Sequence, residues 1–514
     1  MTRLASRTAG LVAVLVFGGI VQAMGCVPFN SAEECDFCEP PGNGGAGGSG
    51  GGTPAGCVPS ENAEPVGDEC GVFVSSSLGV DGAAGTKEQP LRSLGEALMK
   101  ANGKAVYACA ESFAEAIELS AGARVFGGLD CATDWSYVEG QKATIAPGAD
   151  LVPVMLLSGE GARIEDVVAI AADAVVPGGS SIALIAQDGA VAELLRCELR
   201  AGAGAPGAAG STPMEVGPSG EGEDGENGIP GTDGECMSAV AQAGGNGGQR
   251  MCGGMSVSGG LGGSGTTGDT GGAGSPGQGQ PGTPPLDGAG GRGQDAMSCG
   301  SGNAGAEGGP GISGFGATGI GDISAAGYTA ATGSPGMSAG TPGQGGGGGG
   351  GAKACGMMNM FAGPSGGGGG SGGCGGAPGM GGGAGGSSIG LLSHQATVTL
   401  TSVSIATALG GAGGIGGNGQ PGGGGGQPGL GGGSNACVGG QGGSGGRGGS
   451  GGGGLGGHSI GIASKGAVPV QNEVTITAGA PGPGGLGGDG DTSVNGANGQ
   501  GCKTLSFDEP GSCS

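Results

Sequence analysis

Five charged residues in one short stretch are the best candidates for chemistry in this sequence. Glu165, Asp166 and Glu193 lie about one structural repeat apart, with Arg163 and Arg196 beside them. Carboxylates that converge from neighbouring repeats can bind Ca2+ or act as a paired acid and base, and either arginine could serve as the base. The competing interpretation is that these charges face solvent on alternating strands, and we favour it here.

The other reactive side chains form no recognisable site. His394 and His458 are the only histidines, and they stand at non-equivalent places around the repeat described below, so we expect no shared metal site. No nucleophile motif stands in a strand-turn-helix setting. The cluster 357–361, rich in Met, is expected to pack near Cys355. The sequence therefore predicts no catalytic residue, metal or cofactor.

A rung of about twenty residues that occurs three times must position these side chains. Each copy holds two alternating apolar segments around a short polar turn, and each runs into Gly-rich sequence. Ser388 to Ile405 and Ser459 to Ile476 both span 17 residues. A repeat that cannot bury its own apolar face must stack on its neighbours, which predicts a solenoid. The copies occupy residues 181–199, 388–405 and 459–476.

The segment 70–201 has the pattern of an all-β fold. A short helix is expected at Pro90–Leu98, because Leu91, Leu94 and Leu98 recur at helical spacing. Short apolar strands follow it at close intervals. Ile170 and Leu199 occupy similar places in successive units and lie 29 residues apart, a reasonable length for one coil of a parallel β-helix.

This segment also carries a resemblance to a known family. The pattern is a strand, a Gly-Thr-Lys turn, and two further strands that each end in Cys, found at 72–75, 85–90, 106–109 and 125–131, with Trp135 after them. Over residues 70 to 200 it resembles the opening of pectin-lyase-like right-handed parallel β-helix domains. The resemblance implies a solenoid capped by an amphipathic helix, and it raises polysaccharide lyases and hydrolases as an alternative function. Cys109 and Cys131 end neighbouring strands, so we expect them to pair.

Gly-rich sequence dominates the rest of the chain, which is similar to the PGRS family of exported bacterial proteins. Glycines fall in triplet register over several stretches, and three residues is the repeat of the polyproline II helix. A collagen triple helix would need longer unbroken triplets and more Pro. Two alternatives remain: a bundle of extended helices bonded to one another, or disordered loops, since ordering Gly costs more entropy than ordering any other residue.

Composition excludes several classes of protein. Aromatic residues make up only 3% of the chain, too few for a large globular core. The net charge of −25, with 17 Lys and Arg, argues against binding to nucleic acid or electrostatic binding to anionic lipid.

The N-terminus predicts export. Arg3 and Arg7 precede an apolar run, residues 10–21, that is too short to span a bilayer. Two processing sites compete: cleavage after Ala23 by signal peptidase, or a bacterial lipobox that ends at Cys26 and would attach the protein to the outer membrane. The first outcome predicts a secreted protein and the second a surface lipoprotein.

The chain holds sixteen cysteines, and in an exported protein these imply disulfides. Cys35 and Cys38 lack the context of a redox or zinc motif, so we expect structural disulfides there. Lipidation of Cys26 would leave fifteen cysteines, an odd number, so either one thiol stays free or the lipobox interpretation is wrong. The remaining disulfide candidates are Cys109, Cys131, Cys355, Cys374, Cys502 and Cys513.

We therefore expect an all-β, non-enzymatic cell-surface protein of a structural or adhesive kind, with cell-surface glycan or matrix as its partner. The alternative is a carbohydrate-active or glycan-binding β-helix. The expected segments are a signal peptide (1–25), a Cys/Gly-rich tether (26–69), β-helix coils (70–201), Gly-rich excursions (202–386 and 409–457), β-helix rungs (387–408 and 458–480) and a Gly-rich tail (481–514).

Overall fold

A computed structural model describes residues 56–217, 220–233, 236–279, 287–508 and 513–514. The chain divides into two units, Met1–Gly50 and Gly51–Ser514, and every described residue belongs to the second unit. The predicted signal peptide, the lipobox at Cys26 and the pair Cys35 and Cys38 lie outside the described residues.

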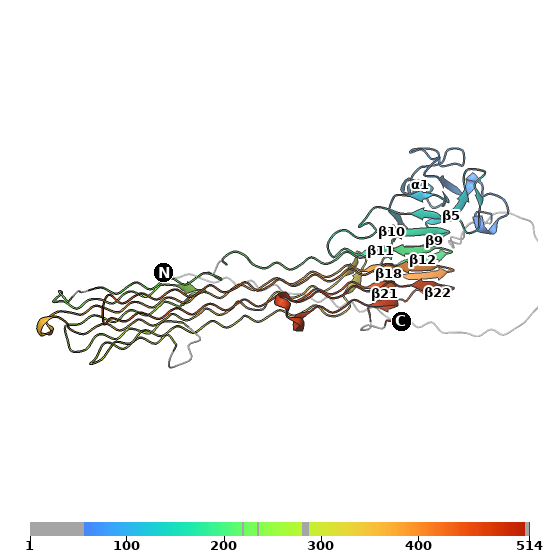
Figure 1. Ribbon diagram of the computed structural model, residues 1–514. Helices are drawn as coiled ribbons and strands as arrows, with labels where there is room; N and C mark the ends of the chain where they lie inside the picture. The colour runs from blue at the N-terminus through green and yellow to red at the C-terminus, as the bar shows by residue number, and fades with distance from the viewer. Residues whose placement is uncertain (1–55, 218–219, 234–235, 280–286, 509–512) are drawn as a thin grey trace, which may run out of the picture. The chain divides into compact units, whose positions relative to one another are not determined.

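Three sheets of mainly parallel strands organise this unit (Figure 1). Sheet A contains β1 (Gly71–Val74), β2 (Ala105–Cys109), β5 (Arg124–Asp130), β9 (Gly159–Glu165), β12 (Ala190–Leu195), β19 (Thr397–Thr401) and β22 (Val470–Asn472), with β6 (Ser136–Tyr137) antiparallel to β5. Sheet B contains β3 (Ser112–Phe113), β7 (Ala143–Ile145), β10 (Val167–Ala171), β13 (Glu198–Ala201), β20 (Ser404–Thr407) and β23 (Thr475–Thr477). Sheet C contains β4 (Ile117–Leu119), β8 (Val154–Leu156), β11 (Ser181–Ala186), β18 (Ser388–His394), β21 (Ser459–Lys465) and β24 (Gly501–Ser506).

From β2 onward the chain visits sheets A, B and C in turn and then returns to A. Each pass therefore adds one parallel strand to each sheet, an arrangement consistent with a β-helix-like solenoid. Besides these sheets, the described residues contain two hairpins, β14 (Met251–Cys252) with β15 (Met255–Ser256) and β16 (Asp322–Ser324) with β17 (Gly327–Thr329).

The three rung copies stack as the sequence predicts. In sheet C, Ser181 pairs with Ser388, and Ser388 pairs with Ser459. The strand register also aligns Leu184, Leu391 and Ile462 in one column, so aliphatic side chains from the three copies lie above one another. The periodicity of the sequence thus located coils that are separated by long insertions.

Two expectations about the coils are wrong in detail. Leu199 pairs with Ala169 and Ile170 pairs with Arg200, so this coil spans 30 residues rather than 29, because a shift of one residue would place the side chain of Leu199 on the opposite face of the sheet. The C-terminal segment 481–514 is not only a Gly-rich tail, since β24 adds a further strand to sheet C beside β21. Few apolar residues mark β24, so only its pairing identifies it.

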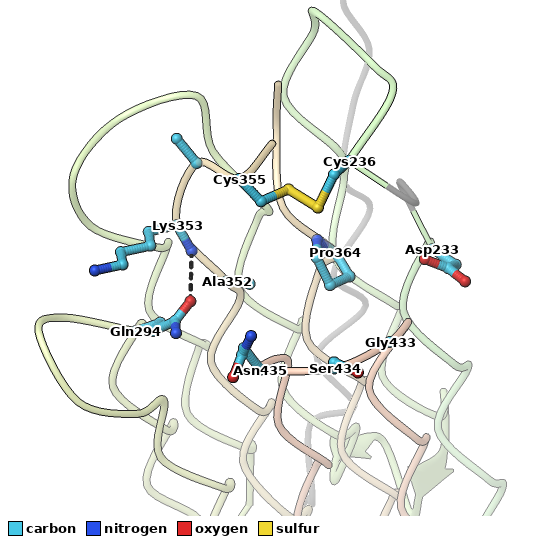
Figure 2. A pocket seen from close by; sticks show the side chains of 11 residues that line it. Asp233, Cys236, Gln294, Ala352, Lys353, Cys355, Pro364, Gly433, Ser434 and Asn435 are labelled. Atoms are coloured by element: carbon cyan, nitrogen blue, oxygen red, sulfur yellow. Dashed lines mark hydrogen bonds between the residues drawn. A yellow bond between two sulfur atoms is a disulfide. The ribbon is translucent and has the colours of Figure 1, made fainter. Parts of the chain in front are cut away.

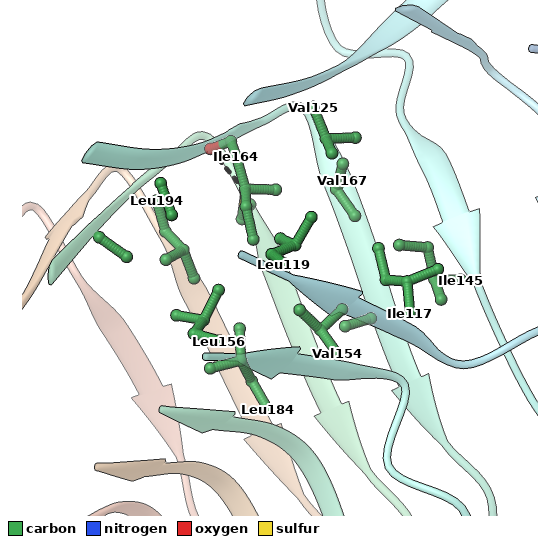
Figure 3. Close-up of a cluster of buried hydrophobic side chains, with 14 of the residues drawn as sticks. Ile117, Leu119, Val125, Ile145, Val154, Leu156, Ile164, Val167, Leu184 and Leu194 are labelled. Atoms are coloured by element: carbon green, nitrogen blue, oxygen red, sulfur yellow. Dashed lines mark hydrogen bonds between the residues drawn. The ribbon is translucent and has the colours of Figure 1, made fainter. Parts of the chain in front are cut away.

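The core lies between the three sheets and consists mainly of aliphatic side chains (Figure 3). In β4 and β8, buried and more exposed residues alternate: Ile117 and Leu119 are buried, as are Val154 and Leu156. Alternation of this kind places every second side chain inside. Ile164 and Leu194 from sheet A and Val167 from sheet B complete the same cluster.

One α-helix, α1 (Leu94–Ala101), is found in the described residues, a few residues later than the expected Pro90–Leu98. The helix begins after Ser93, whose hydroxyl accepts a hydrogen bond from the Glu96 N–H at 3.2 Å. This N-cap sets the start of the helix more strongly than the spacing of leucines does. Leu94, Ala97 and Ala101 face the core, as a cap on the coils requires.

All the long Gly-rich excursions leave the coils at one corner. They connect β13 to β18, β20 to β21 and β23 to β24, and each of these steps runs from sheet B to sheet C. The excursions then run side by side in Figure 1 as extended segments. Of the two alternatives, the ordered bundle is therefore the one that the structure shows for the described residues.

Backbone hydrogen bonds between the Gly-rich segments repeat every three residues. Gly204, Gly207 and Gly210 donate to Leu409, Ala412 and Ile415, so these two segments run parallel from their exits at β13 and β20. Three residues per turn is the repeat of polyproline II, which makes no hydrogen bonds of its own and bonds only to neighbours.

The segment 362–386 lies at the centre of the bundle. Its consecutive residues Gly369, Gly370 and Ser371 each donate to one neighbouring segment and accept from another, so the segment contacts six neighbours. A Cβ added at Gly369 would stand 2.0 Å from the carbonyl oxygen of Gly346, which explains the all-glycine runs. The acceptors are Gly260, Gly440 and Glu226, and the donors are Gly248, Gly346 and Gly426.

Candidate functional site

The charged candidates lie at the corner where sheet A turns into sheet B. One residue in each of four coils turns the chain with a positive φ: 53° at Asp166, 52° at Arg196, 53° at Ser402 and 55° at Glu473. The N–H groups of Asp166, Arg196 and Ser402 each donate to the next coil, so these four positions form a stacked column. A left-handed residue between two strands changes the chain direction sharply, and polar residues tolerate it better than β-branched ones.

Arg196 binds both carboxylates of the coil below it. Its Nη2 lies 2.8 Å from Glu165 Oε2 and 2.8 Å from Asp166 Oδ2, and its Nε lies 3.0 Å from Asp166 Oδ1. Arg163 also pairs with Glu165, and Ser60 donates to that carboxylate at 3.3 Å. Glu165 and Asp166 are only 1% and 2% exposed. Hydrogen bonding to Asp166 raises the pKa of the Arg196 guanidinium, against the opposing effect of burial.

This geometry corrects our expectation about the charges. Glu165 and Asp166 do not face solvent, whereas Glu193 on β12 does and joins no cluster. Two guanidinium groups, those of Arg196 and Arg163, balance the charge of the two buried carboxylates. The arrangement is that of a buried ion-pair network that joins successive coils.

The two histidines lie apart, as expected. His394 pairs with Asp188. His458 is fully buried, with Nε2 3.0 Å from the Ile320 carbonyl oxygen and Nδ1 accepting the Gln500 N–H at 2.8 Å. Burial lowers the pKa of His458, so the neutral ring is favoured. Its role is to tie the Gly-rich segment around Ile320 to sheet C.

Six disulfides form among the described cysteines. Cys109 pairs with Cys131, the pairing expected from their places at the ends of neighbouring strands. Cys197 stays a free thiol, 2% exposed in the core, and its burial raises the pKa to about 12. The other disulfides are Cys57–Cys70, Cys236–Cys355, Cys252–Cys374, Cys299–Cys437 and Cys502–Cys513.

A cavity of about 470 Å³ opens at the end of the bundle that is remote from the strands (Figure 2). Four turns between Gly-rich segments contribute to it. Gln294, which is 8% exposed, accepts the Lys353 N–H on its Oε1 at 3.0 Å. Asp233 and Asn435 lie at the ends of two other turns, and Asn435 has a φ of 68°. The disulfide between Cys236 and Cys355 forms one wall.

Methionines stand around this end of the bundle. Met357, Met358 and Met360 in the turn after Cys355 are 86%, 87% and 59% exposed, and Met297 is 81% exposed. The expectation that the cluster 357–361 packs near Cys355 is therefore wrong for the methionines. Within this cluster only Phe361 is partly buried, and its backbone forms an antiparallel β-bridge with the backbone of Cys355. Flexible thioether side chains in this position offer an adaptable apolar surface.

Sequence reasoning missed the cavity entirely. Its polar residues, Asp233, Gln294, Lys353 and Asn435, are spread over about 200 positions, and no spacing connects them. The sequence did contain one signal for this site. Each of the four residues stands where a run of Gly triplets breaks, and such breaks mark turns between the Gly-rich segments. Which turns come together depends on how the segments pack.

Comparison with known proteins found no match, either to a family model, to a curated protein or to a solved structure. Over the residues that the structure describes, no helix has the length and hydropathy to cross a membrane. Nor does that part of the chain bring three His, Cys, Asp or Glu side chains together as metal ligands would be.

Proposed function

We propose that this chain is an exported, non-enzymatic cell-surface protein of an adhesive or structural kind. In this proposal a right-handed, pectin-lyase-like β-helix holds a Gly-rich bundle and presents the turns at the end of that bundle. The observation that carries it is the common corner from which the excursions leave, together with their mutual hydrogen bonds. A bundle with such a network is a spacer, and its turns are the part available to a partner.

The cysteine count supports anchoring through Cys26. Of the sixteen cysteines, twelve form disulfides and Cys197 is a buried free thiol. Cys26, Cys35 and Cys38 remain. If Cys35 pairs with Cys38, Cys26 is left for a lipid, and the odd thiol that lipidation demands is Cys197. The odd number of cysteines that remains is then no argument against lipidation of Cys26.

An intact mass of the mature protein from the membrane fraction tests the anchor. The protein is alkylated without reduction, once folded and once in denaturant. We expect an acylated Cys26, no alkylation when folded, and one alkylated thiol, Cys197, when unfolded. Cleavage after Ala23 without lipid would replace the anchored protein with a secreted one.

The adhesive role is tested by deletion. Removal of residues 202–457 joins Ala201 at the end of β13 to His458 just before β21, across the same B-to-C corner, and deletes one whole coil. We expect cells with this variant to display it at wild-type levels but to lose adhesion or aggregation. Unchanged cell behaviour at equal display would refute the role.

A carbohydrate-active enzyme is the alternative function. The ion-pair network weighs against it, because the buried carboxylates of Glu165 and Asp166 are both already bound by Arg196. Incubation of the purified protein with polyuronides distinguishes the two. Release of unsaturated or reducing ends that is lost in Glu165→Gln would overturn the non-enzymatic proposal.

A further inference from the structure

Methionine side chains are exposed throughout this protein, although methionine is ordinarily one of the residues most often buried. Of the twelve methionines in the described residues, eleven are exposed, and ten of these eleven lie in the Gly-rich excursion 202–386. The twelfth, Met155 on β8, is partly buried. No cluster of buried hydrophobic side chains in the described part of the chain contains a methionine. The thioether groups therefore contribute little to the packing that holds the fold together.

Four of the exposed methionines lie on two turns that one disulfide joins at the end of the bundle. The bond between Cys236 and Cys355 holds the two Cα atoms 5.4 Å apart (Figure 2). One of the four methionines follows Cys236 directly, and the other three stand within five residues after Cys355. Their exposed fractions range from 59% to 87%. We call this group the methionine tip, and its members are Met237, Met357, Met358 and Met360.

Backbone hydrogen bonds hold these two turns in place. The Cys355 N–H donates to the Phe361 carbonyl oxygen at 2.9 Å, and this bond closes the second turn. The Ala362 N–H donates to the Ser238 carbonyl oxygen at 2.7 Å, and this bond joins the second turn to the first. Neither contact involves a methionine side chain. A chemical change at the thioether sulfur atoms therefore leaves the backbone of both turns intact.

Thioethers are the accessible reduced sulfur in the part of the chain that the structure describes. Twelve of its cysteines form disulfides, and the one free thiol there, Cys197, is only 2% exposed. The susceptibility of a sulfur atom to oxidation increases with its exposure. Among the described residues, an oxidant in solution therefore reaches the exposed methionines before any thiol.

We propose that the methionine tip is an oxidation site, at which oxidants of the peroxide class convert an apolar surface into a polar one without unfolding the bundle. The sulfur lone pair of a methionine attacks one oxygen of the peroxide, an S–O bond forms as the O–O bond breaks, and a proton passes through solvent to the departing oxygen. With hydrogen peroxide the products are methionine sulfoxide and water, since sulfur loses the two electrons that the peroxide gains. The inference goes beyond the adhesive role and does not depend on it.

Treatment of the purified chain, with its disulfides intact, with excess hydrogen peroxide tests the proposal. Peptide mass spectrometry over time measures the oxygen uptake at each methionine. We expect the methionine tip to be oxidised at least about fivefold faster than Met155, because exposure sets the rate. The circular dichroism spectrum and the midpoint of thermal unfolding should stay unchanged, while retention on a hydrophobic-interaction column should decrease.

Two variants with four substitutions each locate the change in polarity. Leucine throughout the methionine tip keeps that surface apolar but removes its oxidisable sulfur, so the peroxide should remove less than half as much retention as in wild type. This variant carries Met237→Leu, Met357→Leu, Met358→Leu and Met360→Leu. The matched control changes four exposed methionines outside the tip and should lose retention as wild type does. Its substitutions are Met214→Leu, Met251→Leu, Met255→Leu and Met337→Leu.

Any of four results would overturn the inference: oxidation of Met155 as fast as that of the methionine tip, loss of the native circular dichroism spectrum on oxidation, unchanged retention of the oxidised wild type, or equal changes in retention in the two variants. None of these results bears on adhesion by cells that display the deletion variant. Conversely, unchanged adhesion after the deletion of residues 202–457 would refute the adhesive role and leave the oxidation site standing.

Discussion

Arg196 is the residue on which the corner between sheets A and B depends. It is 30% exposed at its side chain, yet it binds two carboxylates that are almost fully buried. A buried ion pair gains little over a well-packed apolar pair, but removing one partner leaves an uncompensated charge. The network is therefore a point at which the coils are sensitive to substitution.

We predict that Arg196→Gln destabilises the protein by about 3 kcal/mol, because Glu165 and Asp166 then lose their shared counter-charge in a buried setting. Denaturant unfolding followed by circular dichroism measures this change. Arg200→Gln is the control, since Arg200 pairs with Glu198 at an exposed site and should cost less than about 1 kcal/mol. Equal losses in the two variants would show that burial does not set the cost.

The Gly-rich segments differ in composition according to their place in the bundle. Gly345 to Gly351 is an unbroken glycine run, and this stretch donates to three neighbouring segments and accepts from three. Nearer the strands, residues 333–343 have fewer neighbours, and Pro335, Met337 and Thr341 stand between the glycines. With three residues per turn, each buried side demands glycine once per turn.

We predict that Gly369→Ala lowers the free energy of unfolding of the bundle by about 1–3 kcal/mol, as overpacking does, because the new methyl group would overlap the carbonyl of Gly346. Gly309→Ala is the matched control, since the atom nearest to its new methyl group would be the Thr341 hydroxyl oxygen at 3.7 Å. Thermal unfolding of both variants checks this. A loss in Gly309→Ala as large as in Gly369→Ala would contradict the close-packed description.

Disulfides connect the bundle across long stretches of chain. Cys236–Cys355, Cys252–Cys374 and Cys299–Cys437 span 119, 122 and 138 residues, whereas Cys57–Cys70 spans 13. The entropy that a cross-link removes from the unfolded chain grows with loop length, to about 4–5 kcal/mol for a loop of this size. Glycine segments have almost no apolar side chains to offset their ordering cost, so these bridges matter more here than in an ordinary core.

We predict that Cys252→Ala with Cys374→Ala speeds hydrogen exchange of the amides in residues 345–386 at least tenfold, because the bundle then opens more often. Cys57→Ala with Cys70→Ala should leave those amides unchanged. Hydrogen exchange followed by mass spectrometry on both double variants, with the other disulfides intact, gives the answer. Faster exchange in both variants would instead indicate that the unit unfolds as a whole.

The sequence by itself determined the repeating parts of this protein. The alternating rungs at 181–199, 388–405 and 459–476 predicted coils that stack, since each copy carries an apolar face that only a neighbour can cover. The triplet glycines predicted a three-residue helix, since the period is a local property of the backbone. Both features follow from short-range patterns, and both survived comparison with the structure.

Only the tertiary structure decided what those parts bring together. Order in the bundle depends on hydrogen bonds between segments, such as the six neighbours around Gly369 to Ser371, which no single segment reveals. The burial of Glu165 and Asp166 depends on Arg196 in the next coil. The cavity around Lys353 joins turns from four passes of the chain. Such contacts depend on packing between residues that are distant in the sequence, so the local periodicity of the sequence does not predict them.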